Sequence, residues 1–327
     1  MAEEKFADLG LQEALRRLYD GTPFKPFEAA AHRVLQEGVD FNLVYFPLKH
    51  LGYKAVVEVT GELFAGMRHP EALSIVLGVS AKLDFPQIRE LWSGVVAAAE
   101  EFGYKKLSLD LQPCPNGLSI SLSASGTQKE LTRHSIPSPQ SKDLLCVTGR
   151  LGAAYLGLQV LERERIRFEA GTTAASPEME KNRMLVGAYL HPELPAGIVG
   201  HLEDADIYPS AAVFIRHGLS DAVKRISRQT GLGAKIYADR IPFEGNSFQL
   251  GKELDIDPVS AAMNGGDDCQ LLLAVPILQA EKFRRDFQAF DIIGHLAQQE
   301  VGTVLVTPEG AELPLHAQGW TEQSETE

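Results

Sequence analysis

The stretch AVFIRHGLSDAVKRISRQTGLGAKIYADRIP (residues 212–242) predicts a strand, a tight loop, a helix and a second strand. The stretch begins with a short apolar run, residues 212–215, which Gly218 breaks. From residue 219 the apolar side chains recur at i, i+3, i+4 and i+7, the spacing of a helix with one buried face, and Gly231 suits its end. Arg216 and His217 therefore lie in a loop at a helix N-terminus, where ligands commonly bind in α/β folds.

The charge in this loop is unusual for its position. Arg216 and His217 place cations at the positive end of the helix dipole, which disfavours them. A bound anion would offset that cost, whereas a solvent-screened pair in a plain strand–helix connection would need no ligand. His217 is also a candidate general base, although the sequence identifies no serine or cysteine partner for it.

Composition limits the possible functions. The chain has 327 residues, is 44% hydrophobic and 23% charged, and carries a net charge of −13. These values predict two α+β domains and disfavour nucleic-acid or anionic-membrane partners. Cys114, Cys146 and Cys269 lack metal-ligand spacing and indicate a reducing compartment. Without an apolar leader or a run of about 18 apolar residues, we expect a cytoplasmic location and no membrane partner.

Helices and strands are mixed on both sides of a segment rich in Ser and Pro, residues 132–142, which is the best candidate linker. We therefore expect an N-terminal domain over 1–142 and a C-terminal domain over 143–327. Residues 28–42 are ambiguous between helix and strand. Residues 170–182 are expected to be loop, and residues 244–257 to be a polar insertion.

The strands and helices with the clearest patterns surround these segments. Helices are predicted at 9–19, 50–67, 85–102, 151–163, 184–191 and 196–204, and strands at 72–80, 106–111, 118–125, 144–148, 270–275 and 301–307. The strand at 118–125 alternates apolar residues with serines, so one of its faces is expected to be buried.

Four further features have both a functional and a structural interpretation. The segment GRLG (149–152) lies between a strand and a helix, so its backbone N–H groups could hold a phosphate, but it is not a Walker A sequence and most such turns are structural. The segment NGGDD (264–268) could bind metal or a polar substrate, or be a solvated turn. Asp110 is a metal ligand or a strand-end residue. Trp320 covers a planar ligand or closes the core.

Several segments, in this order, resemble thiamine-monophosphate kinase, of the aminoimidazole-ribonucleotide-synthetase superfamily. They are EGVDFNLVYFPLKHLGYKAVV (37–57), LLCVTGRLGAAYLGLQVLERE (144–164), GLSDAVKRISRQTGLGAKIYADRIP (218–242), NGGDDCQLLLAVP (264–276) and AQGW (317–320). The resemblance implies an N-terminal α/β domain that pairs in a homodimer and a C-terminal α/β domain beside it. It also implies ATP- and Mg²⁺-dependent phosphorylation of thiamine monophosphate.

The departures from the family pattern concern its acids. Arg33 stands where the family has an aspartate in the strand before Glu-Gly-Val-His-Phe. The family's Asp-Val-Ser-Asp-Gly is FIRHG at 214–218, without either acid. The family's Leu-Ser-Asp corresponds to TGE at 60–62, and its Gly-Gly-Asp corresponds to SLD at 108–110. Each of these two segments keeps one acid. The family's Gly-Gly-Glu-Asp is GGDD at 265–268. Loss of most metal-binding acids predicts weak or absent Mg²⁺-dependent catalysis.

The resemblance and the residues together give a candidate site. The metal candidates are Glu62 and Asp110; the phosphate or nucleotide candidates are Arg33, Gly149, Arg150, Gly152, Arg216, His217 and Gly218; the substrate candidates are Gly265, Gly266, Asp267, Asp268 and Trp320. Three hypotheses follow: a weakly active or non-catalytic homologue that binds a phosphorylated small molecule, an active kinase using ATP and Mg²⁺ with a reduced metal set, and a structural partner of a genuine kinase subunit. Under the first or third, the chain needs no cofactor.

Overall fold

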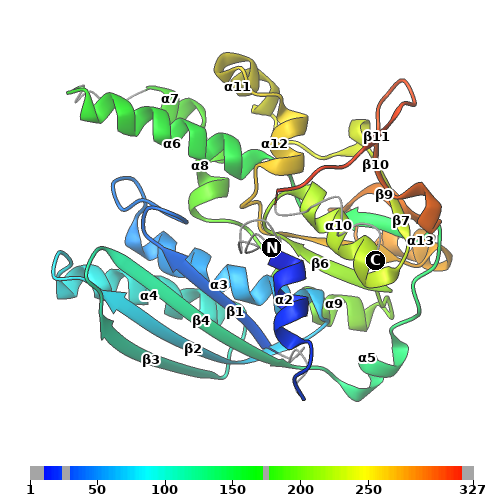
Figure 1. Cartoon of the computed structure of the whole chain (residues 1–327), viewed down its shortest axis with the longest axis horizontal. Helices are drawn as coiled ribbons and strands as arrows, with labels where there is room; N and C mark the ends of the chain where they lie inside the picture. Colours follow the sequence, from blue (N-terminus) through cyan, green and yellow to red (C-terminus); the bar gives the residue numbers. More distant parts are fainter. Residues whose placement is uncertain (1–10, 24–29, 172–176, 319–327) are drawn as a thin grey trace, which may run out of the picture.

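Two β-sheets with helices around and between them form the computed structural model, which describes residues 11–23, 30–171 and 177–318 (Figure 1). The first sheet has the order β1-β4-β2-β3. Its strands are β1 (Ala30–Gln36), β2 (His69–Val79), β3 (Lys106–Pro113) and β4 (Leu118–Thr127). Helices α3 (Leu48–Ala65) and α4 (Phe85–Glu101) lie on one face of this sheet. The predicted alternation in β4 is confirmed: Leu118, Ile120 and Leu122 are buried, while the serines line the other face.

The second sheet has the order β11-β10-β7-β9-β5-β8-β6. Its strands are β5 (Leu144–Val147), β6 (Ala211–Ile215), β7 (Gly233–Tyr237), β8 (Gln270–Val275), β9 (Asp291–Ala297), β10 (Thr303–Val306) and β11 (Glu312–Pro314). The helices of this half are α6 (Ala153–Glu169), α7 (Pro177–Lys181), α8 (Arg183–Leu190), α9 (Ile198–Asp204), α10 (Leu219–Thr230), α11 (Ser247–Leu254), α12 (Pro258–Asn264) and α13 (Ala280–Asp286).

The strand–loop–helix–strand prediction for residues 212–242 is confirmed by β6, α10 and β7. Gly218, the N-cap of α10, has φ +91°, and a Cβ there would lie 2.4 Å from the carbonyl oxygen of Met263. Gly231 ends α10 in the left-handed conformation, at φ +68°. Because β7 pairs with β9 and β10 and not with β6, the helix carries the chain across the sheet.

Four segments differ from the sequence prediction or resolve what it left open. Residues 28–42, left ambiguous, contain β1, which pairs along its whole length with β4. The segments expected to be a loop and a polar insertion contain the short helices α7 and α11, and the candidate linker begins within α5 (Glu130–Ser135). Such short helices bury few apolar side chains, so their periodicity is weak in the sequence.

Helix α3 lies between the two sheets and joins them. A Cβ on Gly61 would lie 2.2 Å from the ring of Phe214, a fully buried side chain on β6. The absence of a side chain at residue 61 therefore lets the aromatic ring of the second sheet pack directly on the helix of the first. This close contact fixes the side of α3 that faces the cavity described below.

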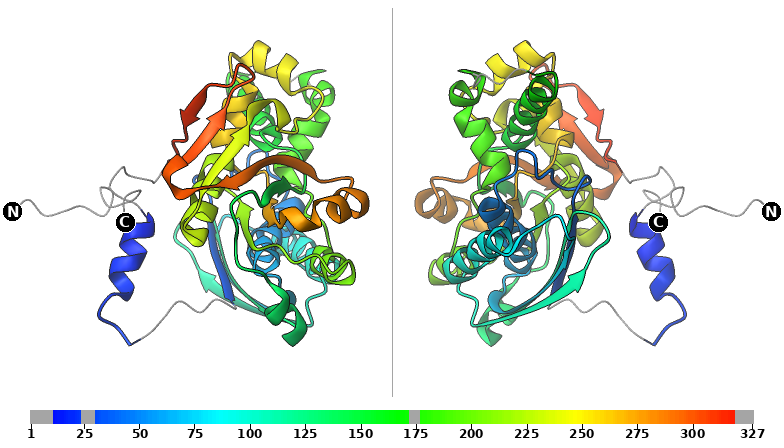
Figure 2. Two further views of the ribbon diagram at one scale, coloured as in Figure 1. Left: turned by 90° about the vertical axis from the view of Figure 1, so that its right-hand side faces the viewer. Right: turned by 90° about the vertical axis from the view of Figure 1, so that its left-hand side faces the viewer.

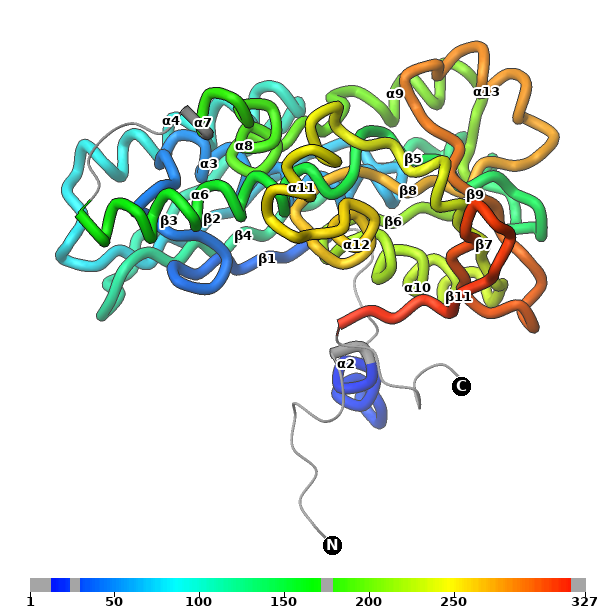
Figure 3. The backbone as a smooth tube through the Cα atoms, turned by 90° about the horizontal axis from the view of Figure 1, so that it is seen from above, coloured from blue at the N-terminus to red at the C-terminus, as the bar shows by residue number. Residues whose placement is uncertain are grey.

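The N-terminal helix α2 (Leu11–Tyr19) lies apart from the two sheets (Figure 2 and Figure 3). Its side chains at Leu15 and Leu18 are exposed. None of the described helices, α2 included, combines the length and the apolar character needed to cross a membrane.

Candidate functional site

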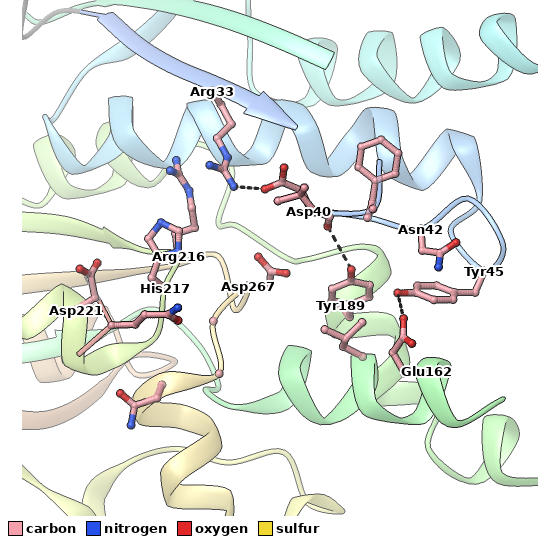
Figure 4. A pocket seen from close by; sticks show the side chains of 18 of the residues that line it. Arg33, Asp40, Asn42, Tyr45, Glu162, Tyr189, Arg216, His217, Asp221 and Asp267 are labelled. Carbon is pink, nitrogen blue, oxygen red and sulfur yellow. Dashed lines mark hydrogen bonds and ion pairs between the residues drawn. The ribbon is translucent and has the colours of Figure 1, made fainter. Parts of the chain in front are cut away.

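A cavity of about 800 Å³ opens between the two sheets. Its walls come from β1, the segment 38–45, helices α3, α6, α8 and α10, and the loops 216–217 and 264–267. Figure 4 shows Arg33, Arg216 and His217 at one end of the cavity and Tyr45 and Glu162 at the other. The cavity therefore has two chemically different ends.

The arginine end is organised around one buried carboxylate. Glu58, on α3, is 1% exposed, and its Oε2 accepts from Arg33 Nε at 2.8 Å and pairs with Arg216 Nε at 3.1 Å. Arg33 also donates from Nη2 to Asp40 Oδ1 at 2.7 Å. Burial raises the pKa of Glu58, and the charge of Arg216 opposes that rise. Two guanidinium groups, one from each sheet region, thus share one carboxylate.

A second paired carboxylate follows on α3. Glu62 lies one helical turn after Glu58 and accepts from Arg225 Nη2 at 3.2 Å through both carboxylate oxygens. Arg216 Nη2 is 3.9 Å from the same carboxylate. The carboxylates of α3 are therefore already paired with arginines.

Lys54 lies one turn before Glu58 on the same side of α3 and adds a third charged residue to this row. It is 2% exposed, and its Nζ lies 3.2 Å from Asp267 Oδ2 and 3.9 Å from the centroid of the Tyr189 ring. Asp267 has φ +64°, a left-handed conformation that is uncommon for a non-glycine residue, and its N–H donates to the carbonyl of Arg216 at 2.6 Å. Strained backbone of this kind is concentrated at functional sites.

The other end of the cavity is aromatic and acidic. Tyr45 donates its hydroxyl to Glu162 Oε1 at 2.6 Å, and the hydroxyl of Tyr189 lies 3.4 Å from the carbonyl oxygen of Asp40. Burial, with Glu162 next in importance, raises the pKa of Tyr45. Burial also raises the pKa of Tyr189, so both tyrosines are neutral near pH 7. Glu162 also pairs with Arg165 at 2.8 Å, so the feature of this end that suits a cationic or aromatic group is mainly the two tyrosine rings.

The cavity brings together only part of the predicted site. Of the sequence candidates, its walls contain Arg33, Glu62, Arg216, His217, Gly265, Gly266 and Asp267. They do not contain Asp110, Gly149, Arg150, Gly152, Gly218 or Asp268. Trp320 lies outside the described residues.

The residues outside the cavity have structural contacts that explain their placement. Asp110 lies on the exposed strand β3 and accepts from its neighbours Leu111 and Gln112. Arg150 is directed to the carbonyl of Phe243 and the carboxylate of Glu244. These side chains are engaged at the surface, away from the cavity walls.

The predicted phosphate cradle of residues 149–152 is occupied by the chain itself. The buried carboxylate of Asp268 accepts from the N–H of Gly152 at 2.8 Å and of Ala154 at 3.2 Å, at the start of α6. A Cβ on Gly149 would lie 2.6 Å from the side-chain oxygen of Gln270. A protein carboxylate therefore takes the position at this helix N-terminus that we had assigned to a ligand phosphate.

The residues do not fit a magnesium site held by the protein. Within the part of the chain that the structure describes, no group of three or more His, Cys, Asp or Glu side chains is arranged to hold a metal ion. Of the two metal candidates, Glu62 is bound by Arg225 and Asp110 is not in the cavity wall. Mg²⁺ prefers several oxygen ligands in octahedral geometry, which these residues do not offer.

The sequence analysis overlooked Lys54, Glu58, Arg225, Tyr45 and Glu162. One signal was available: Lys54, Glu58 and Glu62 recur every four residues in the mainly apolar part of the helix that follows Lys49 and His50. This spacing places the three side chains on one face, and charge within a buried helix needs a partner.

Comparisons with known proteins agree with this architecture. No protein-family model matches the chain. The thiamine-monophosphate kinase of Aquifex aeolicus is 24% identical over 244 residues, covering 74% of each chain, and that of Pyrococcus horikoshii is 26% identical over 250 residues, covering 76% of this chain and 72% of the other. The chain is thus similar in sequence to thiamine-monophosphate kinases over about three quarters of its length.

Solved structures show the same two-domain fold. The Aquifex aeolicus thiamine-monophosphate kinase superposes with a TM-score of 0.76 at 21% identity, covering 95% of this chain and 100% of that one. The structure of AaThiL complexed with AMPPCP and TMP gives 0.78 at 19% identity, covering 96% and 97%. HypE of E. coli, a hydrogenase maturation protein, gives 0.65 at 15% identity, covering 88% and 85%.

We predict that Glu58→Gln strongly destabilises the chain. The substitution keeps the shape of the side chain but leaves Arg33 and Arg216 without their shared carboxylate, so the free energy of unfolding should fall by about 3–5 kcal/mol in urea titration. Glu13→Gln, which removes an exposed partner of Arg16 and Arg17 on α2, is the control and should have no measurable effect. Equal stability of the two variants would contradict the central role of Glu58.

We predict a pH-dependent contribution from Asp268. Burial raises its pKa in the folded chain to about 7, from an ordinary value of 3.8. The folded state then binds this proton more tightly than the unfolded state, so the free energy of unfolding falls as the pH rises through that interval and levels off above it. The stability deficit of Asp268→Asn relative to the natural chain should therefore shrink from about pH 5 to about pH 8. A constant deficit in denaturant unfolding at both pH values would refute this.

Proposed function

We propose that this chain binds a phosphorylated small molecule in the cavity and has weak or no Mg²⁺-dependent kinase activity. The observation that supports this most is the pairing of the α3 carboxylates with Arg33, Arg216 and Arg225. A kinase that holds metal-bound phosphates needs carboxylates free for the metal. Here guanidinium groups neutralise the carboxylates in place of a metal, and the same guanidinium groups can contact a phosphate directly.

Donors for a phosphate remain on these arginines. A guanidinium has five N–H groups, and Arg216 directs only its Nε and Nη2 to Glu58 and Glu62. Arg216 lines the cavity and is 13% exposed at its side chain. A ligand phosphate beside Arg216 and His217 would also offset the two cations at the start of α10.

The opposite end of the cavity suggests the rest of the ligand. A cationic heteroaromatic group would lie between Tyr45 and Tyr189, close to the Glu162 carboxylate. Thiamine monophosphate has such a group at one end and a phosphate at the other, and the similarity to thiamine-monophosphate kinases supports it as the ligand. The neighbour complexed with AMPPCP and TMP supports ATP as a second ligand.

We predict that isothermal titration calorimetry detects thiamine monophosphate binding that EDTA does not abolish. Arg216→Gln should weaken binding by about tenfold or more, because a charge-assisted hydrogen bond is lost. Arg150→Gln is the matched control: Arg150 pairs with Glu244 outside the cavity wall, so affinity should not change. If neither thiamine phosphates nor nucleotides bind the natural chain, the ligand proposal fails.

Enzyme turnover separates the proposal from the active-kinase alternative. With ATP, Mg²⁺ and thiamine monophosphate, we expect no turnover in the range of roughly 1–100 s⁻¹ that is typical of kinases. Turnover in that range, abolished by Asp110→Ala, would instead establish a reduced metal set containing Glu62 and Asp110.

We also propose that the chain divides into domains at 1–142 and 143–327 and that the first pairs in a homodimer. The boundary lies between the last strand of the first sheet, which ends at Thr127, and β5, which begins at Leu144. Strand β3 lies at the edge of its sheet, and Leu109 and Leu111 on it are 40% and 56% exposed. Exposed leucines on an edge strand favour association with another chain.

We predict that the natural chain elutes as a dimer in size-exclusion chromatography with light scattering, and that Leu109→Glu with Leu111→Glu gives a monomer, because charge on the edge strand opposes pairing. Leu278→Glu is the control: this leucine is 96% exposed in the second half, and its replacement should leave the mass unchanged. A monomeric natural chain that associates only with a separate kinase subunit would favour the structural-partner hypothesis.

A further inference from the structure

A second pocket, of about 270 Å³, lies in the C-terminal half and shares no residue with the cavity. The ends of β5, β7 and β9, the turn after β7 and helix α13 form its walls. The cations Lys142, Arg240 and Arg284 line it together with His295, whose pKa is lowered by burial and by the charges of Lys235 and Arg240; among the described residues its wall contains no Asp or Glu. This concentration of positive charge occurs in a chain whose net charge is −13.

The cations of this pocket differ from those of the cavity in having no acidic partner. In the cavity, Arg33, Arg216 and Arg225 are all paired with carboxylates. Across the described ranges, Lys142 and Arg284 have no carboxylate within 4.0 Å. Lys142, Arg240 and Arg284 are exposed, so water and salt screen part of their mutual repulsion, and a bound anion would neutralise the rest.

The pocket has a shaped wall as well as charge. The guanidinium carbon of Arg240 lies 5.0 Å from the centroid of the Tyr237 ring, which restricts the arginine to one side of the pocket. The Tyr237 hydroxyl is 3.5 Å from Nδ1 of His295 on the neighbouring strand. These contacts give two of the polar side chains defined positions.

The backbone of β9 is irregular at this place. Its pairing with β5 shifts by one residue, because Leu145 opposes Gly294 whereas Cys146 opposes Ile292. Both Gly294 and Ile292 line the pocket. Bulges of this type are common beside functional sites, where they redirect the strand.

We propose that this pocket is a second anion-binding site for a small phosphate-bearing molecule. Its volume is at the lower limit of small-molecule sites, so it fits inorganic phosphate or a compact phosphate monoester better than an extended ligand. Arginine and lysine donors beside a tyrosine hydroxyl are suited to phosphate oxygens. The site is independent of the function proposed for the cavity.

The test is equilibrium dialysis with inorganic phosphate, and in parallel with adenosine monophosphate, at constant ionic strength. Arg216→Gln serves as the background in every protein, so that phosphate binding in the cavity is weakened equally in all of them. Arg284→Gln and Arg240→Gln should each weaken phosphate binding by about tenfold or more. Arg285→Gln is the matched control, because Arg285 is the next residue of α13, already pairs with Asp286 and is absent from the pocket wall.

Saturable binding that is lost in Arg284→Gln and Arg240→Gln and kept in Arg285→Gln supports the site. Tighter binding of inorganic phosphate than of the nucleotide identifies the free anion as the ligand, and the reverse identifies the monoester. Absence of saturable binding, or an equal loss in Arg285→Gln, overturns the proposal. A further outcome also overturns it: the chain binds a polyanion such as heparin but not phosphate, and Arg284→Gln abolishes the heparin binding. That result would indicate a surface for a macromolecule.

Discussion

The arrangement of the cavity depends on one buried carboxylate. Glu58 receives Arg33 from the first sheet and Arg216 from the loop after β6 of the second, so the same side chain holds both walls of the cavity. A charge at 1% exposure is tolerated only with close partners. The neighbouring carboxylate, Glu62, depends in turn on Arg225, and the result is a line of alternating charges along α3.

This line gives a physical account of why the described residues offer no group of three or more carboxylate, histidine or cysteine side chains arranged to hold a metal ion. Divalent cations and arginines both neutralise carboxylates, but an arginine is covalently fixed and cannot accompany a departing phosphate. Pairing within the chain thus stabilises the folded protein while it removes ligands from a metal. The chain is similar to thiamine-monophosphate kinases at 24% identity, and within its own cavity Arg33 and Arg216 share the Glu58 carboxylate.

Sequence reasoning was most successful where a local pattern determines the structure. The turn glycines at 218 and 231 and the apolar spacing between them predicted β6, α10 and β7. It failed for Glu58, because its partners lie 25 and 158 residues away and only the packed fold brings them together. Residues 149–152 show a different limit: the phosphate and structural interpretations stayed open because their N–H groups suit any anion, and the sequence cannot tell a ligand phosphate from the distant carboxylate of Asp268.

The contact between Gly61 and Phe214 has a consequence for ligand exchange. The ring packs against the helix backbone without space for even one added carbon, so rotation of one sheet past the other would force a collision or open a void. The two sheets are therefore held in a fixed relative position where Gly61 meets Phe214. The segments 38–45 and 264–267 line the cavity and are not part of either sheet, so entry and release of a ligand would depend on them; the first is held by the buried ring of Phe41 and the second by the contacts of Asp267 with Arg216 and Lys54.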